Sequence, residues 1–130
     1  MGLTLDFGHC LMATENPVQS AALTGHEGKL FGVQLNDGFV KPGCEDGLAL
    51  GTVHPRMTLE FIYWLQRIDY QGHIYFDTFP INEDPVREAE YNIRLYKKWW
   101  KFASDLDEKG IGELLIKQDT MAILELLEGR

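Results

Sequence analysis

Carboxylates, amides and a histidine follow three strand-like runs of this chain, at the point where each apolar run ends. Asp6 and His9 follow the first run, Asn36 and Asp37 the second, and Asp77 the third. Carboxylate and imidazole groups bind divalent cations and transfer protons in proteins. Each residue is also an ordinary strand-end or turn residue. Because the carboxyl ends of parallel strands meet at one edge of a sheet, the recurrence favours a convergent site.

The alternation of side chains along a strand decides which of these groups share a face. Asp6 shares its face with Thr4 on the first strand, Gln34 with Asn36 on the second, and Asp77 with Tyr75 on the third. All three strands therefore place polar groups on one side, which a strand buried on both faces would not do. This parity predicts that the polar ends of the strands lie next to one another.

Strands and helices alternate in the pattern that positions such a site. Strands are expected over residues 3–6, 30–35 and 73–79. Capping residues and prolines predict helix starts at Asn16-Pro17, Pro55 and Asp84-Pro85. A one-sided apolar stripe indicates a long third helix; its members are Ala89, Ile93, Tyr96, Trp100 and Ala103.

The sequence predicts an α/β fold with about three parallel strands, outer helices and a C-terminal helix. A complete (β/α)8 barrel takes roughly 200 residues or more, whereas this chain has 130. We therefore expect a single domain over residues 1–130 that forms the last part of such a barrel. Residues 1–109 would supply the barrel units and residues 110–130 a helical extension, with its helix over 119–127.

Composition excludes several classes of partner. The net charge of -8 leaves nothing to neutralise phosphates, so nucleic acid is not an expected ligand. No run reaches the ~20 apolar residues of a membrane span, and the first residues do not resemble a signal peptide, so we expect a cytoplasmic protein. Cys10 and Cys44 lack a metal-ligand spacing and are expected to be free thiols.

A glycine-rich connection over residues 38–52 is longer than an ordinary strand-to-helix loop. Long loops of this kind on barrel proteins commonly carry functional residues. The loop contains two adjacent acidic residues, Glu45 and Asp46.

Several short motifs, in this order, resemble the C-terminal part of the xylose-isomerase-like TIM-barrel superfamily, and sugar isomerases of the L-rhamnose isomerase type come closest. The resemblance covers about residues 2–104. Its motifs are Asp6-Phe-Gly-His9, Glu15-Asn16-Pro17, Gln34-Leu-Asn-Asp37, Asp46-Gly-Leu48, Val53-His-Pro55, Phe76-Asp-Thr-Phe-Pro80 and Glu83-Asp-Pro-Val-Arg87.

This resemblance implies a divalent cation, Mn²⁺ or Mg²⁺, that binds the sugar. Asp6 and Asp77 match the family's strand-end ligands, and Gln34 stands where the family has a histidine ligand. A glutamine offers a carbonyl oxygen in place of an imidazole nitrogen, which weakens transition-metal binding. The family's glutamate ligand belongs to a strand before Leu3.

The same resemblance implies the remaining roles. Asp37 and Asp46, with Glu45 as an alternative, correspond to loop carboxylates that hold a second cation near the substrate. His9 and Asp37 are expected to act in catalysis. His9 would contact a substrate hydroxyl or the catalytic metal, and Asn36 would contact the substrate.

Two functions of different classes follow as expectations. The first is a metal-dependent sugar isomerase or epimerase whose site is incomplete in this chain. The second is a non-catalytic barrel fragment that serves as a structural or assembly unit. In both cases an open sheet with unpaired edges predicts a homo-oligomer.

Overall fold

The computed structural model describes residues 1–129, and its centre is a parallel sheet of three strands. The strands are β1 (Leu3–Asp6), β2 (Leu30–Leu35) and β3 (His73–Phe76), in the order β1-β2-β3. Asp6 pairs with Gln34 across the first ladder. Gln34 pairs with Tyr75 across the second. The expected α/β fold with parallel strands is confirmed.

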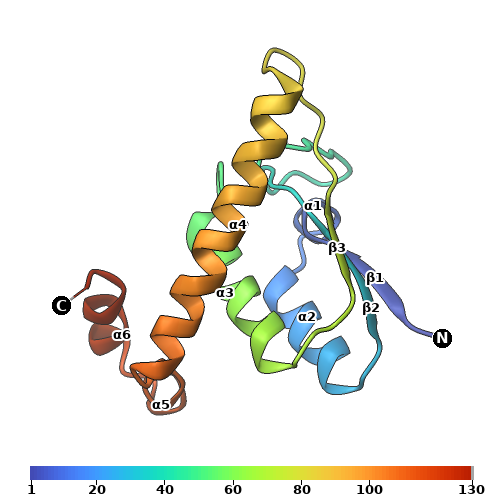
Figure 1. Cartoon of the computed structure of the whole chain (residues 1–130). Helices are drawn as coiled ribbons and strands as arrows, with labels where there is room; N and C mark the ends of the chain where they lie inside the picture. The colour runs from blue at the N-terminus through green and yellow to red at the C-terminus, as the bar shows by residue number, and fades with distance from the viewer. Residues whose placement is uncertain (130) are drawn as a thin grey trace.

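Helices fill the connections and the C-terminal end of the chain (Figure 1). They are α1 (Phe7–Met12), α2 (Pro17–His26), α3 (Pro55–Arg67), α4 (Pro85–Glu108), α5 (Ile111–Lys117) and α6 (Thr120–Leu127). None of those in residues 1–129 is both long enough and apolar enough to cross a membrane.

The predicted capping signals begin helices in the structure. Asn16 Oδ1 accepts hydrogen bonds from the backbone N–H groups of Val18 and Gln19 at the start of α2. Asp84 Oδ1 accepts from the N–H of Arg87 at the start of α4. These bonds satisfy N–H groups that have no partner inside a first helical turn.

Two helices and one strand end differ from the sequence-based expectation. The predicted third strand over residues 73–79 was wrong at its end, because β3 stops at Phe76 and Phe79 N donates to Gly47 O of the long loop. α1 begins directly after β1, since Asp6 caps it. α5 begins after Gly110, which has a left-handed backbone, and so adds a helix to the predicted extension before the one expected over 119–127.

The main core lies on one face of the sheet, where α1, α2 and α3 pack (Figure 1). Leu5, Val33 and Leu35 point into it and are almost fully buried. A second cluster, which joins α3, α4 and α5, consists of Leu59, Ile62, Tyr63, Ala103, Leu106 and Ile111.

The opposite face of the sheet is bare within residues 1–129. Thr4, His73 and Tyr75 are exposed there, and Gln34 is half-buried and contacts the Tyr75 hydroxyl. The predicted parity is confirmed, because these residues alternate with the buried Leu5 and Val33. β1 and β3 are both edge strands, so the sheet is open at both sides.

The two cysteines are free, as predicted, and they differ in their surroundings. Burial raises the pKa of the Cys10 thiol to about 11, and the nearby Glu15 carboxylate adds to this effect. Cys44 is only half-buried. We expect one thiol, Cys44, to react with a disulfide reagent at pH 8 in the folded protein, because reaction requires an accessible thiolate.

The Cys10 thiol also makes stability depend on pH. Its folded pKa lies above the ordinary value of 9.0, so above pH 9 the unfolded chain loses this proton before the folded chain does. The contribution is fully present below pH 9 and is lost as pH rises toward 11. Urea unfolding of wild type and Cys10→Ala measures it: the fall in stability over this range should be smaller in the variant, and equal falls would contradict this assignment.

Candidate functional site

Asp6, His9 and Glu45 gather at the carboxyl end of β1. One potential ligand atom from each of the three lies within 4.8 Å of the other two. Asp6 is buried with 7% of its surface exposed, whereas His9 is exposed and Glu45 half-buried. The cluster therefore spans the boundary between the protein interior and solvent.

One oxygen of Asp6 holds the local structure and the other has no hydrogen bond. Asp6 Oδ1 accepts hydrogen bonds from His9 N at 3.0 Å and from Asn36 Nδ2 at 3.2 Å. Asp6 Oδ2 is buried and has no hydrogen-bond partner among the described residues. Burying a carboxylate oxygen without a hydrogen bond costs free energy of folding, and a bound cation would offset that cost. Asp6 Oδ2 is therefore a candidate cation ligand.

Glu45 completes the cluster from the long loop. Its Oε1 lies 3.0 Å from His9 Nε2, but the two atoms do not form a hydrogen bond of normal geometry. Oε1 is buried and has no other partner in residues 1–129. Asp6 and Glu45 therefore each have a buried carboxylate oxygen without a hydrogen bond, and that of Glu45 lies within ion-pair distance of His9.

Backbone contacts bring Glu45 back to the strand ends. Asp37 and Leu48 exchange two backbone hydrogen bonds of 2.9 Å, which close the loop next to Glu45. Gly47 has φ +60, and a Cβ there would lie 2.2 Å from the Phe79 ring, so glycine fits this close turn. Asp46 Oδ2 accepts from Phe39 N and thereby braces the loop.

Asp37 joins both ends of this loop. Its fully buried carboxylate accepts from the N–H groups of Gly38, Val53 and His54, each at 2.8 Å. The Nδ1 atom of His54 lies 2.9 Å from Asp37 Oδ1. This geometry gives Asp37 a structural role, and its expected catalytic role stays a prediction.

Asn36 connects the ends of all three strands. Its Oδ1 accepts from Gly8 N at 2.7 Å, and its Nδ2 donates to Asp6 Oδ1 and to Asp77 O. The side chain is fully buried. A Cβ on Gly8 would lie 2.7 Å from Asn36 Oδ1, so glycine permits this approach. The structure thus supports Asn36 as a positioning residue for Asp6, and the expected substrate contact remains untested.

The other predicted ligands lie apart from the cluster. Gln34 donates its amide N–H to the Tyr75 hydroxyl on the bare face. Asp77 and Asp46 do not belong to the three-residue cluster. Of the loop carboxylates left open by the sequence, the geometry favours Glu45 over Asp46.

Asn92 and Glu88 on α4 are buried polar residues that the sequence did not single out. Asn92 Oδ1 accepts from Leu50 N at 2.9 Å and so fixes the end of the long loop on α4. Glu88 Oε1 lies 3.4 Å from Asn92 Nδ2. The residues next to Asn92 in the sequence do not indicate that its side chain is buried or that it binds Leu50, which is 42 positions away.

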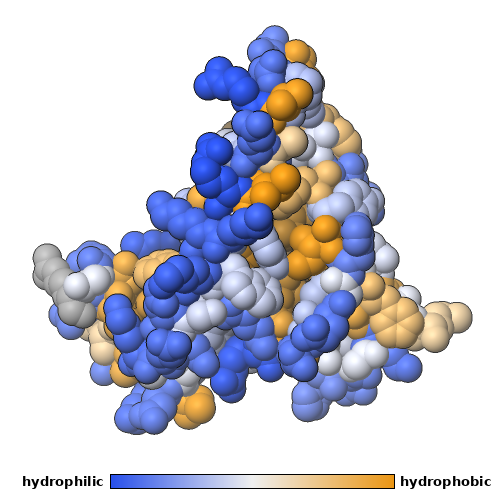
Figure 2. Space-filling view, viewed as in Figure 1, coloured by the Kyte–Doolittle hydropathy of each residue, from blue (hydrophilic) through white to orange (hydrophobic). Residues whose placement is uncertain are grey.

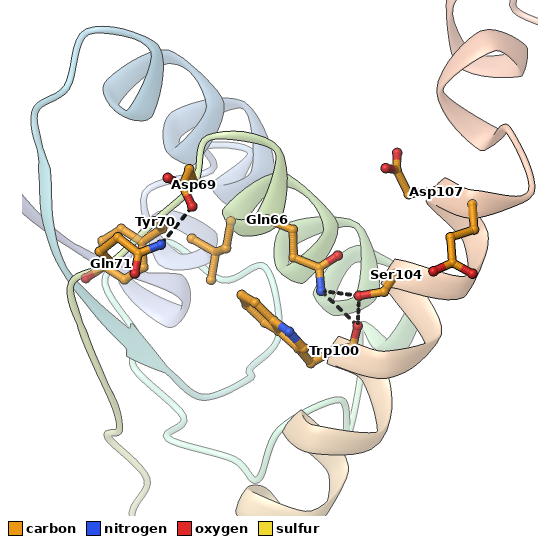
Figure 3. A pocket seen from close by; sticks show the side chains of 9 residues that line it. Gln66, Asp69, Tyr70, Gln71, Trp100, Ser104 and Asp107 are labelled. Atoms are coloured by element: carbon orange, nitrogen blue, oxygen red, sulfur yellow. Dashed lines mark hydrogen bonds between the residues drawn. The ribbon is translucent and has the colours of Figure 1, made fainter.

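A separate hollow between α3 and α4 lies at the other end of the sheet (Figure 3). Its volume is about 330 Å³. Gln66 Nε2 crosses it to Trp100 O at 2.8 Å and to Ser104 Oγ at 3.0 Å. Tyr70 and Gln71 precede β3, whereas the cluster follows β1 and β2, so this hollow is not part of the candidate site.

The donor set of the cluster fits a divalent cation. Two carboxylates and one imidazole suit Mn²⁺ better than Mg²⁺, since Mg²⁺ prefers oxygen ligands throughout. The His9 side chain is more exposed than that of Glu45, so a cation bound here could also bind a small molecule from solvent. The arrangement can bind a cation and present it to a small polar molecule.

A comparison with models of protein families finds none that matches this chain. A comparison with curated protein sequences finds no similar protein.

Proposed function

We propose that this chain carries the divalent-cation site of a sugar isomerase or epimerase of the xylose-isomerase-like kind. The observation that supports the proposal is the gathering of Asp6, His9 and Glu45 at the carboxyl end of a parallel strand, where each carboxylate has one buried oxygen without a hydrogen bond. Active sites of β/α barrels lie at this end of their strands. The partial barrel itself is part of the proposal.

Asp6, His9 and Glu45 would hold the cation, Mn²⁺ in preference to Mg²⁺. When bound, the cation supplies a Lewis acid that polarises a sugar carbonyl. Asn36 orients Asp6, and Asp37 holds the loop that delivers Glu45. The substrate class is an aldose or ketose whose neighbouring oxygens can approach from the exposed His9 side.

The isolated chain should show little or no isomerase activity. Carbonyl chemistry needs further groups that stabilise developing charge and move the proton, and such groups must be held in place beforehand. On the bare sheet face, among Thr4, Gln34, His73 and Tyr75, only His73 is a base near neutral pH. It is the first residue of β3 and so lies at the end of the sheet away from the carboxyl strand ends. Rapid turnover by the purified chain would contradict this expectation.

Binding of polyols to the Mn²⁺-loaded chain tests the proposed function. Water-proton relaxation reports the water molecules near Mn²⁺, and an acyclic pentitol with neighbouring hydroxyls should displace them. We expect the relaxation enhancement to fall on addition of pentitol to the wild type, while a monohydric alcohol at equal concentration leaves it unchanged. An enhancement that pentitol does not alter would contradict the sugar assignment.

A second candidate is a non-catalytic assembly unit. The bare sheet face and the two open edge strands favour it, because such edges template pairing with another chain. This candidate predicts association with or without Mn²⁺ and no effect of pentitol on the relaxation of bound Mn²⁺. The expected homo-oligomer belongs to both candidates.

A further inference from the structure

The first half of α4 presents an apolar seam whose first members are exposed to solvent, while its last two members also pack on one side against the core of the chain. Val86 is 64% exposed and Ile93 46% exposed. Ala89 is also exposed, and Tyr96 and Trp100 are half-buried. These five residues are spaced three, four, three and four apart, which is the a/d repeat of a coiled coil.

Two shallow, open depressions lie on the surface of α4 along this seam and share Lys97. One has a volume of about 420 Å³ and is lined by Glu90, Ile93, Arg94 and Lys97. The other has a volume of about 330 Å³ and is lined by Tyr96, Lys97 and Trp100. Figure 2 shows hydrophilic side chains along α4 and hydrophobic ones gathered in the hollowed surface beside it.

We infer that this seam binds the same seam of a second copy, with the two α4 helices antiparallel about a two-fold axis. In this register Ala89 lies opposite Trp100 of the second copy, and Ile93 lies opposite Tyr96. Each layer pairs a smaller with a larger side chain, as interdigitating helices require. A two-fold axis repeats every contact, which gives four layers over roughly 16 Å of helix.

The flanking charges select the same register. Glu90 and Lys97 each follow a seam residue directly and occupy the position that contacts the partner helix in a coiled coil. The register places Glu90 beside Lys97 of the second copy, and the symmetry makes this pair twice. Neither residue forms an ion pair within the described part of the chain. Both charges are therefore available to a partner.

In the antiparallel register, small side chains of the seam lie opposite large ones and Glu90 lies opposite Lys97. Because the seam thus matches itself in size and in charge, we infer that its partner is a second copy of this chain. The inference is independent of the proposed sugar chemistry, since no cluster residue takes part.

Sedimentation velocity of the full chain at roughly 1–100 µM tests the inference. We expect a species of twice the 14.9 kDa chain mass. Lys97→Glu replaces two attractive pairs by two repulsive ones and should weaken the dimer roughly tenfold. The double variant Glu90→Lys/Lys97→Glu exchanges the charges and should restore affinity to within about threefold of wild type.

Matched controls separate the seam from general effects of charge and hydrophobicity. Lys98→Glu makes the same charge change one position outside the seam and should leave the dimer intact. Ile93→Asp should abolish the dimer in this range, whereas Ile116→Asp, at an 86% exposed site on α5, should not. A monomeric wild type, equal effects of Lys97→Glu and Lys98→Glu, or a double variant no tighter than Lys97→Glu would overturn the inference.

Discussion

Replacing Asp37 by asparagine is expected to lower the free energy of unfolding by about 3 kcal/mol. Asp37 Oδ2 accepts from the N–H groups of Val53 and His54. The asparagine amide would present an N–H to these donors, so two buried hydrogen bonds to a charged group would be lost. Urea unfolding monitored by tryptophan fluorescence measures the change.

Asp46→Asn provides the matched control for this prediction. Asp46 lies in the same loop but accepts one exposed hydrogen bond, from Phe39 N, so its replacement should cost less than about 1 kcal/mol. Hydrogen exchange adds a local readout, because amides of residues 38–53 should exchange faster in Asp37→Asn. If Asp37→Asn were as stable as wild type, the structural role of Asp37 would be wrong and its predicted catalytic role would gain support.

Replacing Asp6 by asparagine is expected to weaken Mn²⁺ binding by about 100-fold or more. The change removes the anionic oxygen Oδ2, which has no hydrogen-bond partner among residues 1–129, and retains Oδ1 for His9 N and Asn36. The metal-free variant should be at least as stable as wild type, because it no longer buries an uncompensated charge. Calorimetric titration with Mn²⁺ and urea unfolding measure the two effects.

Two further aspartate variants distinguish this site from the ligand set implied by resemblance. Asp77→Asn and Asp46→Asn should bind Mn²⁺ as wild type does, whereas Glu45→Gln should lose binding. Wild-type affinity should be weaker than micromolar, since three protein ligands do not complete a cation site. Loss of binding in Asp77→Asn with retention in Glu45→Gln would instead support the strand-end set of Asp6, Asp77 and Gln34.

Local signals made much of the fold predictable. Asn16 and Asp84 cap helices in the structure as the sequence indicated, because a cap and its partners lie within three residues. The sequence also predicted that Gln34 and Tyr75 lie on the same face of the sheet, because side chains alternate between the two faces along each strand. α1 was missed because Asp6 ends a strand and caps a helix at once, and a single residue gives no separate signal for each role.

The site was only partly predictable because its geometry depends on long-range contacts. Asp6 and His9 were identified from the end of one strand. The choice of Glu45 over Asp46 depends on where the loop closes, which the bridge between Asp37 and Leu48 determines. Asn92 contributes through a bond to Leu50, 42 positions away. The spacing of residues along the chain does not predict such long-range contacts.

Anomalous diffraction from crystals soaked in Mn²⁺ shows whether a cation binds at Asp6, His9 and Glu45. Data on either side of the manganese absorption edge locate the ion without assumptions about its ligands. We predict one strong anomalous peak within bonding distance of Asp6 Oδ2, Glu45 Oε1 and His9 Nε2. The absence of a peak there, or a peak at Asp77 and Gln34 instead, would show that the proposed cation site is wrong.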